Sequence, residues 1–276
     1  MPGNAGAANT PRLRRHYRVF VPLVVALTAL AWLALWAWAS SPYGRYLEHG
    51  VVHGSGTASG PAAALCRALP AGDLVVPVLL YAAAWILMIA AMMLPTTLPL
   101  FDAFDRLTGS RPDHGRLMLL LGLGYMGAWG AFGILAHGLH EGLLALLNRS
   151  PQLAWNGWIV GAAVIAGAGA FQFSRLKYAC LDRCRSPLGF VIAHWRGRAY
   201  KQQAFLLGLH HGAWCVGCCW ALMLLMFAVG AGSLGWMLVL AAVMAIEKNT
   251  PWGPRLGKPL GVVLLAWSAL LVASHA

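Results

Sequence analysis

Apolar segments long enough to cross a lipid bilayer are the feature that most constrains this chain. Seven candidates occur, at residues 19–39, 75–94, 117–138, 153–173, 205–229, 234–246 and 259–273. A helix needs about 20 apolar residues to span the hydrocarbon, where every backbone polar group must bond within the protein. The sequence therefore predicts an all-α, polytopic transmembrane helix bundle of about seven spans. The last two segments are short, so six or eight spans also fit.

The composition agrees with a membrane protein. Of the 276 residues 59% are hydrophobic and 10% are charged, whereas soluble domains carry about 25% charged residues. The first apolar segment is too long for a signal-peptide core, and we expect it to be a retained helix. The predicted organisation is a basic cytoplasmic segment, residues 1–18, followed by a single transmembrane domain, residues 19–276.

The basic residues are distributed unevenly between the two sides of the predicted membrane. The net charge is +12, and all but three of the 20 lysines and arginines lie in the amino-terminal segment or in the loops after spans two, four and six. The exceptions are Arg45, Arg67 and Arg149. Positive residues favour the cytoplasmic side, so we expect a cytoplasmic amino terminus and an external carboxyl terminus. The positive charge orients the chain in the lipid bilayer and does not indicate a nucleic-acid partner.

Soft metal donors gather in the stretch GLHHGAWCVGCCWALM, residues 208–223. On a helix, His211, Cys215 and Cys218 fall within about 60° of one another, and Cys219 and Met226 widen this face to about 100°. Cys and Met select Cu(I), and Cys with His also suits Zn. A bound cation would offset the cost of burying thiolates. We therefore predict a metal site, most favourably for Cu(I), with the three cysteines as primary ligands and His211 as a supporting ligand.

One helix cannot easily complete a coordination sphere, so further donors must come from elsewhere. Cys180 and Cys184 are spaced i,i+4 in a basic segment that we place at the cytoplasmic edge, where they could pass metal in or out. By helix rise the pair lies about 10–20 Å from Cys215, and joining the two would need a re-entrant or kinked segment. The possible supporting donors are Met88, Met92, Met93, Met223, Met226 and Glu247.

Two other interpretations of the cysteines remain open. Cys215 and Cys218 form a C-x-x-C pair, which would suit a membrane thiol–disulfide oxidoreductase, although thioredoxin-like pairs lie at a helix start within a βαβ unit. Buried cysteines also serve as small apolar packing residues, as in a structural membrane subunit. The sequence contains no P-loop, nucleophile elbow, zincin or dinucleotide-binding motif, which disfavours an enzyme.

The charged pair at the end of the sixth segment is also open to interpretation. Glu247 and Lys248 are sequence neighbours and do not face each other on a helix. Each could mark the membrane boundary, or could pair with the basic loop or with Asp102 and Asp105. An internal ion pair or a cation relay is the functional alternative.

Several of these motifs resemble the DUF2182 family of predicted metal-binding integral membrane proteins of bacteria. The matching stretches are MMLPTTLPL (92–100), FQFSRLKYACLDRCRSPLGF (171–190), CVGCCWALM (215–223), Trp236-Met237 and Glu247-Lys248. The resemblance covers residues 80–255. It implies a bound metal. We therefore expect metal handling by transport, delivery or sensing in the bacterial inner membrane, with metal-delivery or membrane proteins as partners. Many relatives carry a Met-Asn-Leu segment after Phe-x-x-Gly, and in this chain that place reads Ala231-Gly232-Ser233-Leu234.

Overall fold

The computed structural model describes residues 10–40, 72–149, 157–196, 199–229 and 234–275, and every regular element in these ranges is a helix. The α-helices are α1 (Thr10–Ala39), α3 (Gly72–Met92), α4 (Leu98–Thr108), α5 (His114–Arg149), α7 (Gly157–Phe171), α8 (Arg175–Arg185), α9 (Pro187–His194), α10 (Tyr200–Val229), α11 (Leu234–Asn249) and α12 (Gly257–His275). Two short 3-10 helices, η2 (Pro95–Thr97) and η3 (Gly253–Leu256), precede α4 and α12. Residues 1–9, and the place of the relatives' Met-Asn dipeptide, lie outside the described residues.

Four helical segments are long and apolar enough to cross a membrane: Val21–Ala39, His114–Leu143, Tyr200–Met226 and Gly253–His275. Two helix pairs pass the same test if each counts as one broken span. Tyr81–Met92 and Pro95–Thr108 meet at 50°, and Trp158–Phe171 and Arg175–Arg185 meet at 64°. The helical membrane bundle expected from the sequence is confirmed with four to six candidate spans. The count of seven stays a prediction, because α11 is not among the candidates found in the described part of the chain.

Large apolar side chains face outward on the peripheral helices. Leu30, Leu33 and Trp36 on α1 are 60%, 60% and 62% exposed, and Val263 and Leu270 on α12 are 61% and 69% exposed. Exposed apolar surfaces of this breadth are rare on soluble monomeric proteins. Lipid chains are the solvent that these faces fit.

Close packing of α5 against α10 forms the centre of the bundle. A Cβ atom on Gly124 or Gly208 would overlap backbone atoms of the facing helix, and one on Gly212 would lie 2.7 Å from the Cβ of Ala128. Small residues let membrane helices approach until their backbones touch. Besides α5, α10 contacts α7, α8, α9 and α11, and most of its buried side chains lie from His211 onward.

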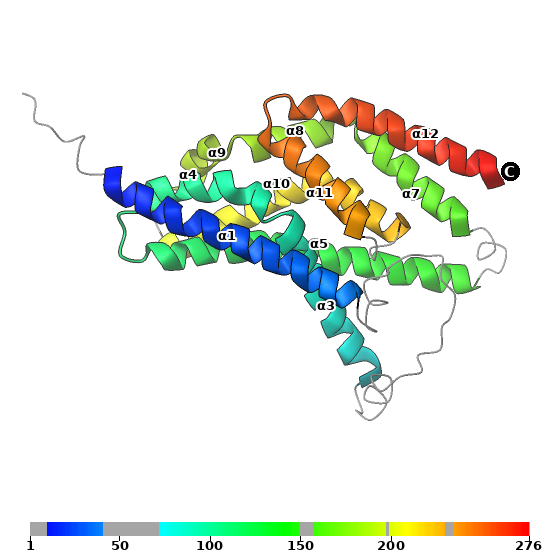
Figure 1. Ribbon diagram of the computed structural model, residues 1–276, viewed down its shortest axis with the longest axis horizontal. Coiled ribbons are helices and arrows are strands. Elements are labelled where there is room, and N and C mark those ends of the chain that lie inside the picture. Colours follow the sequence, from blue (N-terminus) through cyan, green and yellow to red (C-terminus); the bar gives the residue numbers. More distant parts are fainter. Residues whose placement is uncertain (1–9, 41–71, 150–156, 197–198, 230–233, 276) are drawn as a thin grey trace, which may run out of the picture.

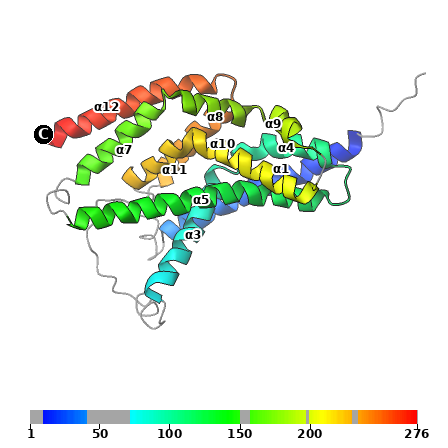
Figure 2. The same ribbon diagram turned by 180° about the vertical axis from the view of Figure 1, so that it is seen from behind.

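Different helix termini lie at the two ends of the bundle (Figure 1). The beginning of α1 lies toward the same end as α4 and α9, whereas the carboxyl end of α12 lies at the opposite end, near the end of α5 and the start of α7. The view from behind gives the same arrangement (Figure 2). The start of α1 and the junction between α4 and α5, which the charge pattern assigns to one side of a membrane, therefore lie toward the same end of the molecule.

The interior consists of two clusters of buried side chains. One cluster, built mainly from α4, α5, α9 and α10, is aliphatic and aromatic, with Phe101, Phe104, Leu121 and Phe190 among its members. The other, larger cluster contains most of the buried sulfur atoms together with Trp129. The distribution of sulfur therefore singles out the second cluster as the candidate site.

Candidate metal centre

The bend between α7 and α8 brings the basic segment's cysteines onto α10. Ser174 caps α8 by accepting a hydrogen bond from the backbone N–H of Lys177, so α8 begins as a new helix at 64° to α7. Cys184 Sγ then lies 3.9 Å from Cys218 Sγ. The separation of about 10–20 Å expected from helix rise is wrong for this pair, because the chain turns back instead of continuing along one axis.

Cys180 reaches the same helix one turn away from Cys184. A Cβ atom on Gly217 would lie 2.7 Å from Cys180 Sγ, so glycine is what allows the sulfur to approach α10. Both residues of the basic segment's pair thus contact the helix that carries the other three cysteines. We call the five residues together the thiol cluster: Cys180, Cys184, Cys215, Cys218 and Cys219.

Cys218 and Cys219 are directed back toward their own helix. Their Sγ atoms donate to the backbone oxygen of Cys215 at 3.0 and 2.9 Å. All three cysteines of α10 are at most 2% exposed. A rotation about χ1 would free either thiol for another partner without moving the helix.

Cys215 has partners from two other helices. The hydroxyl of Tyr125 on α5 lies 3.1 Å from its Sγ, and Lys248 Nζ on α11 donates to the same sulfur at 2.9 Å. Lys248 also approaches Met93 Sδ at 3.6 Å and Cys219 Sγ at 3.9 Å. One cationic nitrogen therefore stands among three sulfur atoms inside the protein.

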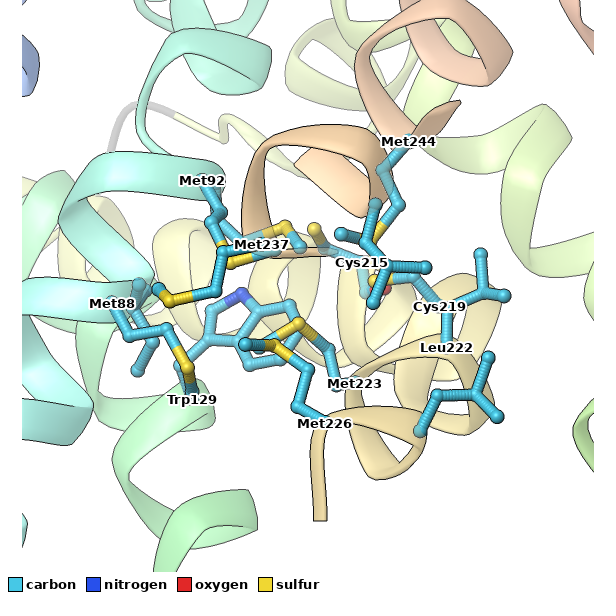
Figure 3. Packing of buried hydrophobic residues seen from close by; sticks show 14 of the residues in the cluster. Met88, Met92, Trp129, Cys215, Cys219, Leu222, Met223, Met226, Met237 and Met244 are labelled. Atoms are coloured by element: carbon cyan, nitrogen blue, oxygen red, sulfur yellow. The ribbon is translucent and has the colours of Figure 1, made fainter. Parts of the chain in front are cut away.

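Methionines from three helices extend the sulfur-rich region beyond the thiols. Figure 3 shows Met88 and Met92 of α3, Met223 and Met226 of α10 and Met237 of α11 grouped around the ring of Trp129. Trp129 is fully buried, and its indole Nε1 has no hydrogen-bond partner among the described residues. We call the thioether side chains of this core the thioether cluster: Met88, Met92, Met93, Met223, Met226, Met237 and Met244.

His211 is buried one turn before Cys215 on α10, but its surroundings are aromatic. Its ring lies 6.4 Å from that of Tyr125 and 5.5 Å from that of Phe190, measured between centroids. The residue is 4% exposed, and within the part of the chain that the structure describes its Nδ1 has no hydrogen-bond partner. This buried nitrogen is therefore able to bind a further partner, such as a metal ion.

Glu247 forms an ion pair beside the site. Its carboxylate accepts from Lys177 Nζ at 2.6 Å, and Lys177 also donates to Gln172. Arg185 holds the same helix end by donating to the backbone oxygens of Glu247 and Thr250 at 2.6 and 2.7 Å. Glu247 thus pairs with the basic segment, which is one of the two pairings that the sequence left open. Asp102 and Asp105 bind Arg106 and His114 instead.

The donors fit a soft monovalent ion better than a zinc ion. Within the described residues, no group of three or more His, Cys, Asp or Glu side chains is arranged to hold a metal. The sulfur atoms around Lys248 Nζ are two thiols and one thioether, and methionine is a ligand that Cu(I) accepts and that zinc sites rarely use.

The sequence did not reveal five residues of the site: Tyr125, Trp129, Met237, Met244, and Lys248 as a neighbour of sulfur. For Lys248 a signal existed, because a lysine at the end of an apolar segment can extend its chain into the interior. Tyr125 and Trp129 give no such signal, since nothing in a single sequence tells which helix packs against α10.

Comparison with known proteins gives one match. The sequence profile of a family described as copper chaperones, PpoB2, matches residues 82–271. Neither the curated proteins nor the solved structures contain a match. The matched range includes α4, α5, α8, α10 and α11, and with them every residue of the thiol and thioether clusters.

Proposed function

The chain belongs to the copper chaperone family PpoB2, and from this premise we propose that it holds Cu(I) as cargo among the sulfur atoms of its interior and delivers it to a partner protein. The proposed location is the bacterial inner membrane, with several spans and a cytoplasmic amino terminus. The family membership supports copper handling. Delivery, as opposed to transport or sensing, is the part that we add.

The observation that carries the proposal is the meeting of two thiols and one thioether from two helical segments around the ammonium group of a lysine from a third. Cys215 and Cys219 of α10 lie with Met93, at the end of α3, around one position, which Lys248 of α11 now fills. Two or three sulfur ligands suffice for Cu(I), which these soft donors select. The proposed primary ligands are Cys215, Cys218 and Cys219.

The remaining donors suit a path along which the copper ion moves from ligand to ligand, and not a single fixed site. Cys180 and Cys184 contact α10 from the predicted cytoplasmic side, and the thioether cluster continues from Cys219 toward Trp129. Thioethers are neutral, so a cation can pass among them without breaking a strong ion pair. A string of weak soft ligands therefore supports transfer of the ion to a partner, whose own ligands would complete it.

Elemental analysis tests the proposal. Protein purified in detergent under reducing conditions and given Cu(I) is expected to retain about one copper per chain, and the variant Cys215→Ser with Cys218→Ser is expected to lose it. Ala221→Ser is the matched control, because it buries a hydroxyl on the same helix without removing a thiol. Copper retained equally by all three proteins would overturn the assignment of these ligands.

Two other outcomes would favour the alternatives. Retention of zinc in place of copper, lost in the same double variant, would assign the thiols to a zinc site. A reversible disulfide with no retained metal would favour a thiol–disulfide oxidoreductase, and mass mapping would show whether Cys218 pairs with Cys215 or with Cys184, the thiol 3.9 Å away.

A further inference from the structure

Lys248 occupies the position at which the sulfur donors converge. Its Nζ lies 2.9 Å from Cys215 Sγ, 3.6 Å from Met93 Sδ and 3.9 Å from Cys219 Sγ. The residue is 8% exposed, and the three sulfur-bearing residues are at most 2% exposed. The geometry is that of a cation surrounded by soft donors, with an ammonium group as the cation.

A metal ion and this ammonium cannot occupy the position together. The nitrogen is already in contact with Cys215 Sγ, and a copper ion bound to the same sulfurs would need that space. Two buried positive charges at contact would also repel strongly in a medium of low dielectric. Exchange of one monovalent cation for another leaves the charge of the interior unchanged, which avoids this cost.

The helix that carries Lys248 is held in place on its other side. Glu247, the preceding residue, pairs with Lys177 of α8, and Arg185 binds the backbone oxygens of Glu247 and Thr250. These contacts fix the end of α11 against α8. Displacement of the ammonium therefore has to occur by rotation of the lysine side chain and not by movement of the helix.

A second position is open to the Lys248 side chain, at the end of its helix. Lys248 lies in the last turn of α11, one residue before the helix ends at Asn249. A lysine at a helix end can extend its four-carbon chain toward water while its stem stays in apolar surroundings. The alternative position of the ammonium is thus the predicted cytoplasmic surface.

We propose that Lys248 is the resident cation of the site, which Cu(I) displaces on loading and which returns when copper leaves. The residue then keeps the thiols occupied in the empty protein and helps to expel the metal at delivery. This inference rests on the proposed copper function and concerns the side chain that competes with copper for the same ligands.

Amine labelling tests the exchange in the unmodified chain, which contains four lysines. The purified protein is treated with a water-soluble amine-reactive ester, with and without one equivalent of Cu(I) supplied as its acetonitrile complex, and each lysine is quantified by peptide mass spectrometry. Labelling of Lys248 is expected to rise about tenfold or more on loading, as a group that leaves the interior loses its protection. Lys177 should stay protected, and exposed Lys201 and Lys258 should label equally in both states.

The variants separate this inference from the function on which it rests. In Cys215→Ser the copper response of Lys248 should disappear, whereas Ala221→Ser should keep it. Copper retained at one per chain with Lys248 still protected would overturn the exchange and leave the copper function standing. Failure of the protein to retain copper would overturn both.

Discussion

At the scale of single residues, the buried ion pair Lys177–Glu247 illustrates how the site is supported. The two side chains are 0% and 3% exposed, so each depends on the other for compensation of its charge. Removing one partner of such a pair leaves a buried charge alone, which costs about 3–5 kcal/mol. Because breaking the pair is so costly, this one ion pair helps to fix the position of α8 against α11.

Lys177→Met is expected to lower the free energy of unfolding by about 3–5 kcal/mol, because Glu247 is left without a cation. The double variant Lys177→Met with Glu247→Gln should recover most of this loss, since no charge remains buried. Thermal or denaturant unfolding in detergent measures both. A double variant as unstable as the single one would show that the charges themselves do not matter.

The thioether side chains give a second prediction at this scale. Met223→Leu with Met226→Leu keeps apolar volume but removes two sulfur atoms beside Trp129. Copper affinity is expected to fall about 10–100-fold, the range found for side chains that support a metal site. Competition with a Cu(I) chelator measures it. Met118→Leu is the control, because Met118 packs against the other cluster, and an equal loss there would contradict a ligand role.

At the scale of elements, the crossing of α5 and α10 decides where the cysteines of α10 point. Gly208 and Gly212 form a small-x-x-x-small pattern, which allows two membrane helices to pack backbone to backbone. Tyr125 can reach Cys215 only because this approach is so close. The geometry of the site therefore depends on residues that carry no chemistry themselves.

Gly208→Ala is expected to destabilise the bundle by about 1–3 kcal/mol, as its Cβ would overlap the carbonyl oxygen of Leu121. Gly138→Ala on α5, where a Cβ would meet no atom within 4 Å, should be neutral or slightly stabilising. Melting temperatures in detergent compare the two. Equal effects would mean that the crossing is looser than described.

At the scale of the whole molecule, the charge pattern and the fold agree for the start of α1 and for the α4 and α9 helices, which lie on a shared side. The beginning of α1 and the α4 and α9 helices lie toward one end, opposite the carboxyl end of α12 (Figure 1). A periplasmic-type reporter such as alkaline phosphatase is therefore expected to be active after residue 276 and inactive between α4 and α5. A fluorescent protein should give the reverse pattern, and activity on the same side at both positions would overturn the orientation.

The fold class was predictable from the sequence because hydrophobic length and charge asymmetry act on each segment separately. The soft donors on α10 were predictable for the same reason, since a helix sets their spacing. The contacts of Cys184 with Cys218 and of Lys248 with Cys215 were not, because they depend on the bend after Phe171 and on the packing of α11. The 16 residues of α11 also leave the predicted count of seven spans unsettled by length alone.

The thioether cluster makes the protein susceptible to oxidative damage. Methionine sulfur is readily converted to the sulfoxide, which places a polar oxygen among closely packed apolar side chains. Under the proposed function, copper that cycled between Cu(I) and Cu(II) in the presence of oxygen would generate the reactive oxygen species that drive this conversion. A cell that uses this chain under oxygen would therefore need to repair or replace it, and the loss of apolar packing around Trp129 would be the earliest sign of the damage.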